Sequence, residues 1–439
     1  MLILKKVESQ MTDSDSVSGF VETLSALHTT FSPDDYVNHF GEVPRMIDAI
    51  ESSVVNQFLG TSFPCMCSDI LRFVESRDSI ESLRSQIPCT VSFDAIEVYI
   101  LVSMSFLGIP LVRAEHRTTL KDGTCVYMFS SRPKQVAKLT CLLNYFNVIV
   151  AAKQSFFPSN VSDLILRRRI SVERIVAEKT HGGEWWLHEC NNPLSKVEYM
   201  PKFHRIETAH HAIQADFANK HIGGGVLRTG CVQEEIRFII SPETLISVFL
   251  CDPLDDNEAL IIRNTVQISS YTGYSQSFKC TGFSKGLLEI FSESNNTLPT
   301  DDILCIDATP YTSEEQRRRQ FGVHAIIREL EKCRCGLSGT MGKPFATGNW
   351  GCGVFGGDSQ LKAVIQWLAA SACSVDLLYF PFDDMSTADL SRLHEACKSL
   401  TVSHVARCLF ECLAEEANHN RLIPAMIERM QISNPDHAT

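Results

Sequence analysis

The feature that most constrains this chain is a run of three glycines at positions 223–225, between a strand-like and a helix-like segment. Three successive residues without a Cβ let the backbone turn sharply, and their N–H groups can approach a ligand closely. Eight residues after Gly225, the sequence Gln-Glu-Glu at positions 233–235 begins an apolar, helix-like run. The glycines suit a phosphate-sized anion, and the carboxylates suit acid–base chemistry. The segment therefore predicts an anion-binding loop followed by a pair of reactive acids.

Composition narrows the class of protein. The chain has 439 residues, enough for two or three domains, and 44% of them are hydrophobic, so it can bury a sizeable core. The formal net charge of −12 argues against a protein that coats DNA. The longest apolar run, at positions 98–112, is shorter than the roughly 20 residues of a membrane span, so no membrane association is expected. The 17 cysteines form no Cys-x-x-Cys pair, and no metal site is expected.

Three regions are predicted along the chain. Residues 1–35 are polar and rich in Ser and Asp, which predicts a loosely held N-terminal segment. Residues 36–160 carry apolar residues three and four positions apart, which predicts a helical accessory domain. Residues 161–439 alternate strand-like and helix-like segments, which predicts a three-layer α/β domain.

The elements of the third region are predicted from periodicity and apolar runs. Strands are expected at 170–177, 196–200, 212–218, 259–268, 303–308 and 375–380. Helices are expected at 242–250, 313–332, 361–371 and, as the last one, near 404–417. Ser241 is the expected N-cap of the helix at 242–250.

A second glycine-rich stretch spans positions 346–358. Within it, Gly351-x-Gly353-x-x-Gly356 has the spacing of a Rossmann dinucleotide loop, and Asp376 follows twenty residues later. The preceding residues do not resemble a strand, and Asp376 begins a strand where the ribose-binding acid should end one. We therefore interpret the stretch as a loop that approaches a phosphate. A nicotinamide-dependent oxidoreductase is the disfavoured alternative, which a lack of nicotinamide binding would exclude.

A catalytic role for Glu234 and Glu235 must be weighed against the ordinary role of two adjacent acids in a sequence. Adjacent acids at a helix start are usually surface residues that the helix dipole favours. Here an apolar run follows them, so the helix that they begin should be buried on one side. Because neighbouring residues on a helix do not share a face, the two should act in different directions. This differs from the usual glycosidase pair, whose acids lie on opposite sides of the bond.

These features together resemble the signature of the poly(ADP-ribose) glycohydrolase family, in which Gly-Gly-Gly is followed by seven residues and Gln-Glu-Glu. Further segments look like family motifs in family order. They are Asp216-Phe-Ala-Asn219, Tyr271-Thr-Gly-Tyr274, the stretch 346–358 and the segments 361–366, 379–382 and 400–403. The segment 138–146 is similar to part of the family's helical domain. The resemblance covers residues 90–415.

The resemblance implies a macrodomain of the three-layer α/β/α class with a mixed sheet, preceded by a helical accessory domain. It implies hydrolysis of the ribose–ribose O-glycosidic bond of poly(ADP-ribose), with release of ADP-ribose and with neither cofactor nor metal. Glu235 would be the catalytic acid/base, acting through an oxocarbenium-like transition state. Glu234 would hold ribose hydroxyls, and Asp216 would support the site.

The resemblance also implies a set of substrate-binding residues. Both glycine-rich loops would wrap the diphosphate with backbone N–H groups, and Arg228 could add a cation there. Adenine would lie among Ile206, Glu207, Asn219, Tyr274 and Asn349, with Phe382 near the distal ribose. The full implied set is Ile206, Glu207, Asn219, Gly223, Gly224, Gly225, Gln233, Tyr274, Asn349, Trp350, Gly351, Cys352, Gly353, Val354 and Phe382.

Two other functions stay open beside an exo-acting hydrolase that could also cleave internal bonds. One is a non-catalytic macrodomain that binds ADP-ribose, although such readers lack Gln-Glu-Glu after the glycine loop. The other is a hydrolase of mono-ADP-ribosylated protein. The expected partners are poly(ADP-ribose) and poly-ADP-ribosylated proteins, without direct DNA binding. A monomer in the nucleus, with the cytoplasm as a second compartment, and a role in the DNA damage response are expected.

Overall fold

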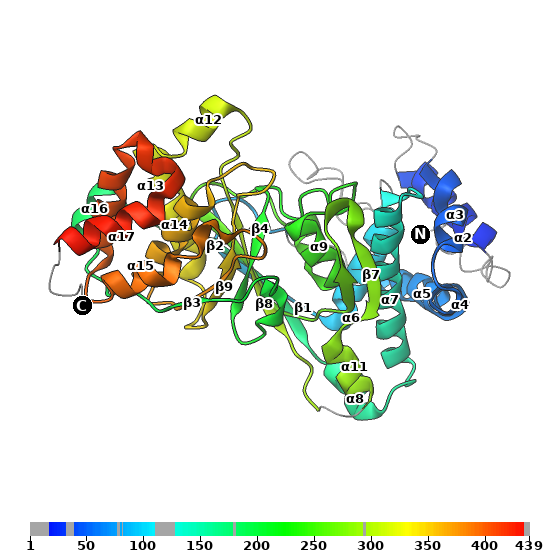
Figure 1. Cartoon of the computed structure of the whole chain (residues 1–439). Coiled ribbons are helices and arrows are strands. Elements are labelled where there is room, and N and C mark those ends of the chain that lie inside the picture. The colour runs from blue at the N-terminus through cyan, green and yellow to red at the C-terminus, as the bar shows by residue number, and fades with distance from the viewer. Residues whose placement is uncertain are drawn as a thin grey trace.

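The computed structural model describes residues 17–31, 39–76, 80, 82–109, 128–178, 181–292 and 296–433. Helices of the N-terminal part gather at one end of the molecule, and a large sheet with its covering helices forms the rest (Figure 1). The C-terminal helices lie at the far end from the N-terminal ones.

An eight-stranded sheet forms the centre of the fold, in the order β1-β2-β5-β8-β4-β9-β10-β3. In that order the strands are β1 (Cys89–Asp94), β2 (Arg169–Val176), β5 (Glu258–Thr265), β8 (Asp301–Asp307), β4 (Ile213–Ala218), β9 (Phe345–Gly348), β10 (Leu377–Phe380) and β3 (Val197–Tyr199). The pairs from β8 to β3 are parallel, and those from β1 to β8 are antiparallel. The sheet is mixed, as the family resemblance implied.

Both faces of the sheet are covered, which makes the domain three-layered. Along β8, Ile303 and Cys305 join one hydrophobic core, and Leu304 and Ile306 join the other. Successive side chains of a strand point to opposite faces, so a strand covered on both sides is apolar throughout. All seven residues of β8 are buried, and its continuous apolar run at 303–306 explains why the sequence predicted the strand correctly.

The helices divide between the two faces and the N-terminal end of the molecule. Packed with one core are α13 (Val323–Leu337), α14 (Ser359–Ala372), α15 (Leu390–Cys397), α16 (Val402–Leu413) and α17 (Leu422–Ser433). Packed with the other are α6 (Ala95–Phe106), α7 (Pro133–Lys153), α8 (Ser159–Leu166), α9 (Gln233–Ile240), α10 (Leu245–Leu250) and α11 (Lys285–Phe291). The N-terminal helices are α2 (Val17–Phe31), α3 (Val43–Asp48), α4 (Ser52–Gln57) and α5 (Phe63–Ser76). The short α12 (Glu314–Arg319) and the hairpin β6 (Ser269–Thr272) and β7 (Lys279–Phe283) complete the described elements.

The helical domain is organised around α7. Aromatic rings from α2, α5, α6, α7 and the turn after α4 pack with centroids 4.9 to 6.1 Å apart. Among the described helices, α7 is long and apolar enough to cross a membrane by length and composition alone. However, 89% of its apolar window is buried inside the protein, which is the pattern of a core helix.

Two predictions for the N-terminal half need correction in part. Within the segment 1–35, which was expected to be loosely held, residues 17–31 form α2 and bury Phe20, Leu24 and Leu27, while the rest of that segment lies outside the described residues. The described residues of 36–160 are mainly helical, as predicted, but β1 interrupts the helices and pairs with β2 as the edge of the central sheet. In β1 only Val91 and Phe93 are buried, so its apolar alternation is too short to stand out beside the long helices.

Three helix predictions also need correction. The helix predicted at 242–250 begins with a 3₁₀ turn, α10 starts only at Leu245, and Ser241 does not cap it with its side chain. The helix predicted at 313–332 is split into α12 and α13 by Gly322, whose extended backbone begins α13. The helix predicted near 404–417 is α16, and α17 follows it.

A buried ion pair joins β2 to β5 beside the site-bearing strands. The Arg174 Nη1 lies 2.7 Å from Glu258 Oε2, and both side chains are fully buried. The Glu258 carboxylate also accepts the Asp255 N–H at 2.8 Å. Without Arg174, this carboxylate would remain buried with no compensating cation.

Replacing Arg174 by alanine is therefore expected to lower the free energy of unfolding by about 3–5 kcal/mol, the usual effect of removing one partner of a buried pair. The matched control is Arg167→Ala, because the Arg167–Asp163 pair is exposed and such pairs contribute less than about 1 kcal/mol. Urea unfolding followed by tryptophan fluorescence measures both. Equal losses in the two variants would contradict this account.

Candidate active site

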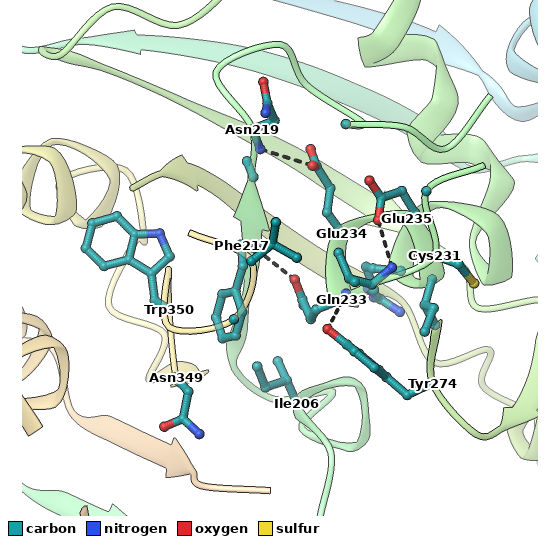
Figure 2. A pocket seen from close by; sticks show the side chains of 18 of the residues that line it. Ile206, Phe217, Asn219, Cys231, Gln233, Glu234, Glu235, Tyr274, Asn349 and Trp350 are labelled. Carbon is teal, nitrogen blue, oxygen red and sulfur yellow. Dashed lines mark hydrogen bonds between the residues drawn. The ribbon is translucent and has the colours of Figure 1, made fainter. Parts of the chain in front are cut away.

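A cavity of about 740 Å³ opens at the carboxyl ends of the parallel strands. Its walls come from the segments that follow β3, β4, β8, β9 and β10, together with the start of α9 and the turn after β6 (Figure 2). The carboxyl edge of parallel strands is where ligands bind in such sheets. The cavity collects most of the residues that the sequence singled out. They are Ile206, Glu207, Asn219, Gly224, Gly225, Gln233, Glu234, Glu235, Tyr274, Asn349, Trp350, Gly351, Gly353, Val354 and Phe382.

Gln233 fixes the start of α9 against the end of β4. Its side-chain oxygen accepts the Phe217 N–H at 2.8 Å, and its side-chain nitrogen donates to the Ala215 carbonyl at 3.0 Å. Its backbone N–H donates to the Tyr274 hydroxyl at 3.2 Å. The side-chain amide of Gln233, which was expected to bind substrate, is therefore hydrogen-bonded to β4. In this position Gln233 orients the two glutamates that follow it.

The two glutamates are held by different backbone N–H groups, and an oxygen of each carboxylate lies close to Gly224 (Figure 2). Glu234 accepts the N–H groups of Gly223 at 2.6 Å and Asn219 at 3.0 Å. Glu235 accepts those of Gly225 and Val232, each at 2.8 Å. Each carboxylate therefore ties α9 to the preceding loop or to the end of β4.

Glycine is required where the loop passes closest to the acids. Gly224 has a φ of +50°, and a Cβ there would lie 2.5 Å from a carboxylate oxygen of each glutamate. At Gly230 a Cβ would lie 2.6 Å from Glu235 Oε1. No side-chain carbon fits at such separations, so the glycines serve the glutamates directly.

This arrangement corrects the expected role of the glycine triplet. The N–H groups of Gly223 and Gly225 donate to the glutamates, and that of Gly224 donates to the His221 carbonyl at 3.1 Å. None of these three donors is left for a diphosphate in this conformation. Gly223 does not line the cavity, and a Cβ there would lie 2.5 Å from Val248 Cγ2.

The second glycine-rich loop supplies free donors instead. Gly353, Val354 and Phe355 line the cavity, and their N–H groups have no acceptor within the part of the chain that the structure describes. A Cβ at Gly353 would meet open space, whereas one at Gly351 would lie 2.5 Å from the Ala308 Cβ. Successive unpaired N–H groups in a turn form a concave anion site. The loop is therefore suited to a phosphate, as the sequence indicated.

Three predicted residues of this loop have structural roles. The Asn349 side chain donates to the Pro381 carbonyl at 3.0 Å and accepts the Tyr379 hydroxyl at 2.8 Å. Trp350 is fully buried and donates to the Ile306 carbonyl at 2.9 Å. Cys352 does not line the cavity, and burial raises the pKa of its thiol to about 12. These side chains hold the loop rather than offer polar groups to a ligand.

Asp216 lies on β4, fully buried and outside the cavity wall. No strong donor reaches its carboxylate, and its polar neighbour is the weakly donating Cys305 thiol. Burial, with repulsion from Glu235, raises the pKa of Asp216 to about 7. Burial and the charges of Asp216 and Glu235 also raise the pKa of Glu234 well above its usual range. Asp216, Glu234 and Glu235 therefore share one buried region, in which burial and neighbouring negative charge oppose ionisation of Asp216 and Glu234.

A third wall contains residues that sequence reasoning missed. The Tyr271 hydroxyl donates to the Glu207 carboxylate, and the Arg205 guanidinium lies 4.2 Å above the Tyr271 ring. Both residues line the cavity. Tyr271 belongs to the motif that singled out Tyr274, so the motif could have indicated it. Arg205 had no signal except its place next to Ile206.

The structure also separates residues that were grouped around adenine. Asn219 lies beside Glu234, at the opposite end of the view in Figure 2 from Ile206. Phe382 packs on Phe203, three residues before Ile206, rather than among the acids. Arg228 is exposed and does not line the cavity, so it adds no cation there. No cluster of three metal-binding side chains occurs among the residues described.

The helical domain supports the loop between the glycines and the acids. The fully buried Lys138 donates its ammonium group to the carbonyls of Val226 at 2.9 Å and Arg228 at 3.0 Å. The Gln135 amide donates to the Arg228 carbonyl at 3.0 Å. Both side chains project from α7. A helix far away in the sequence therefore fixes the outer side of the loop that holds Glu235.

Fold and site define a macrodomain that is preceded by a helical domain and carries a pair of acids in its cavity. Two family models match the chain: "Poly (ADP-ribose) glycohydrolase (PARG), Macro domain fold" at residues 185–389, and the "helical domain" of the same family at residues 50–162. Together they cover well over half of the sequence, and the chain belongs to the poly(ADP-ribose) glycohydrolase family.

Curated relatives carry the same family name. The chain is 32% identical to poly(ADP-ribose) glycohydrolase 1 of Caenorhabditis elegans over 60% of its length and 33% of that protein. It is 30% identical to poly(ADP-ribose) glycohydrolase 1 of Arabidopsis thaliana over 54% of its length and 52% of that protein. The chain thus spans a third to a half of these two relatives. A solved glycohydrolase of Deinococcus radiodurans, in complex with ADP-ribose, is similar at 15% identity with a TM-score of 0.31, covering 57% of this chain and 98% of that one. A TM-score this low supports no structural argument.

Replacing Lys138 by methionine should loosen the loop, because two loop carbonyls would lose a charged donor worth about 1.5–3 kcal/mol each. We expect hydrogen exchange of the segment 225–235, measured by mass spectrometry, to accelerate at least tenfold. Lys153→Met is the matched control, since Lys153 lies on the same helix but pairs with Asp69 inside the helical domain. Unchanged exchange in Lys138→Met would refute the anchoring role.

Replacing Asp216 by asparagine should change how stability depends on pH. Because folding raises the pKa of Asp216 from 3.8 to about 7, the folded protein keeps a proton that the unfolded chain loses between these values. Stability from this group is present below pH 4 and is lost as the pH rises to 7. The variant should therefore gain stability relative to the wild type over this interval, by at most about 4 kcal/mol, and level off above it. Urea unfolding at pH 4.5 and pH 8 tests the sign, and a difference independent of pH would refute it.

Proposed function

We propose that this protein hydrolyses the ribose–ribose O-glycosidic bonds of poly(ADP-ribose) and releases ADP-ribose. The observation that carries the proposal is a pair of glutamates, each held by its own backbone N–H groups, in the same cavity as a loop with unpaired N–H groups. The volume of about 740 Å³ lies within the range of sites for small ligands. The names of the curated relatives support the same substrate.

In this proposal one ADP-ribose unit spans the cavity. Its diphosphate lies on the N–H groups of residues 353–355, which bind an anion without a metal. Its adenine lies against Ile206, Glu207 and Tyr274, where apolar and polar groups meet. The ribose that carries the scissile bond then reaches the glutamates and Asn219. Local donors supply the anion site, which is compatible with the acidic net charge of −12.

Glu235 acts as the acid/base in the proposed reaction. Its carboxyl group donates a proton to the departing ribose oxygen as the glycosidic C–O bond breaks and an oxocarbenium-like ribose develops. Its carboxylate then accepts a proton from water, whose oxygen bonds to the anomeric carbon, and the acid is restored. Positive charge on the sugar is stabilised by the surrounding carboxylates, which the protein holds in place before the reaction.

Glu234 and Asp216 have supporting roles. Burial raises the pKa of Glu234, whose two oxygens accept the N–H groups of Asn219 and Gly223. In the proposal this side chain also binds the ribose hydroxyls, which can donate to it. Asp216 lies behind the cavity wall and influences the site through charge, so it is a positioning residue rather than a group that touches substrate.

The proposal extends to partners and location. Poly-ADP-ribosylated proteins are the proposed macromolecular partners, engaged through their polymer, and a monomer without direct DNA binding is sufficient for this chemistry. We place the protein in the nucleus and also in the cytoplasm, with a role in the DNA damage response. The substrate class is the support for these assignments.

Glu235→Gln is expected to lower the rate of ADP-ribose release from purified polymer by 10²- to 10⁴-fold, the usual contribution of a general acid/base. Binding of ADP-ribose, measured by calorimetry, should change less than about threefold, because glutamine keeps the size of the side chain. Glu395→Gln, on the exposed face of α15, is the control and should leave both quantities unchanged.

The same measurements separate the alternatives. Turnover at the wild-type rate in Glu235→Gln would remove this glutamate from the mechanism. Binding of ADP-ribose by the wild type without any release from polymer would identify a non-catalytic reader. Release of ADP-ribose from a mono-modified protein would identify a hydrolase of mono-ADP-ribosylated protein.

A further inference from the structure

An exposed aromatic pair extends the cavity wall outward. Phe203 is 58% exposed and Phe382 is 45% exposed, and their rings meet edge to face with centroids 6.0 Å apart and planes at 89°. Phe382 lines the cavity, whereas Phe203 does not. The ring of Phe203 therefore continues the apolar wall past the mouth of the cavity.

The backbone holds both rings in this place at a conformational cost. Phe203 has a φ of +66° and Phe382 a φ of +56°, which is the left-handed region that bulky residues avoid. The Phe203 N–H donates to the Phe382 carbonyl at 2.8 Å, so the two strained turns support each other. They follow β3 and β10, which are neighbouring parallel strands. Such a backbone conformation costs roughly 1–3 kcal/mol. Because the two rings stay exposed, burial of the side chains does not offset this cost, which points to a function for the rings.

Cationic and titratable groups flank the ring of Phe203. The Lys202 Nζ lies 5.0 Å from the ring centroid and 2.7 Å from Asp383 Oδ1, at the surface. His204 and Arg205 follow in sequence and line the cavity. Single exposed phenylalanines are ordinary, but an aromatic ring beside a cation is the arrangement that proteins use to stack a base and neutralise its phosphates. The chemistry fits an adenine nucleotide.

We propose that Lys202 and Phe203 form a second nucleotide subsite, which takes the ADP-ribose unit covalently joined to the one in the cavity. The adenine of that unit stacks on Phe203, and its diphosphate is neutralised by Lys202. This inference rests on the proposed function, because a polymer is the ligand that presents two linked units.

The position of Phe203 selects which neighbouring unit is bound. Phe203 lies three residues before Ile206, at the adenine end of the proposed ligand and away from Glu234 and Glu235. The neighbour is therefore the unit attached through the adenosine ribose. A polymer whose linked units occupy both subsites extends out of the cavity at the end opposite the scissile bond. The enzyme would therefore bind internal ADP-ribose units of the polymer as well as its terminal unit.

Binding of oligomers of defined length tests the subsite. In the Glu235→Gln background, which prevents turnover, Phe203→Ala should weaken binding of the ADP-ribose dimer and of longer oligomers by about tenfold, within the range that loss of one stacked base produces. Binding of the ADP-ribose monomer should stay within twofold. Phe203→Tyr should restore oligomer binding, and Phe156→Ala, which removes another exposed ring beyond the end of α7, should change neither.

Product length is the second measurement. With active enzyme and long polymer, Phe203→Ala should lower the early yield of oligomers relative to ADP-ribose. Unchanged oligomer affinity would refute the subsite, and equal losses for monomer and oligomer would assign Phe203 to the cavity itself. Binding of a second ADP-ribose monomer per protein molecule, lost in Phe203→Ala, would show an independent nucleotide site. It would contradict the proposal that the subsite takes a unit covalently joined to the one in the cavity. Failure of the proposed function would look different, since the wild type would then bind or cleave no polymer.

Discussion

Four backbone N–H groups that hold two carboxylates are the constraint on which the rest of this structure depends. Glu234 is bound by the end of β4 and the glycine loop, and Glu235 by the same loop and the N-cap of α9. Strand, loop and helix must therefore keep a fixed spacing, and Gly224 must lack a Cβ to pass between the carboxylates. The glycine triplet has the composition of an anion-binding loop, but its N–H groups at Gly223 and Gly225 donate to the protein's own carboxylates, Glu234 and Glu235.

Burial then determines how this group of acids can carry charge. Burial raises the pKa values of Asp216 and Glu234, and the negative charges of the neighbouring acids add to this effect. Repulsion between these neighbouring acids opposes the loss of protons from Asp216 and Glu234. The unpaired N–H groups at 353–355 offer a separate place for negative charge. One cavity can therefore accept a diphosphate beside a cluster of acids.

The helical domain takes part in the site through α7. Lys138 and Gln135 bind the outer carbonyls of the loop whose inner N–H groups bind the glutamates. The central sheet also includes β1, which precedes α6 in the chain. The helical domain and the macrodomain consequently meet at the edge strand β1 and at the loop between the glycines and the acids. A change in packing around α7 can therefore alter the position of Glu235 through the backbone of that loop.

The sequence by itself determined the alternation of strands and helices, the pair of acids at the start of α9 and the need for glycine before them, because apolar periodicity and a missing Cβ are local properties. It did not determine that the triplet's N–H groups bind glutamates, that Asn349 and Gln233 are engaged by strands, or that Phe203 packs on Phe382. Each of these depends on segments far apart in the chain, such as Lys138 and Val226, which are 88 residues apart. The raised pKa of Asp216 was likewise decided by tertiary structure, since a pKa depends on burial and neighbouring charge rather than on adjacent residues.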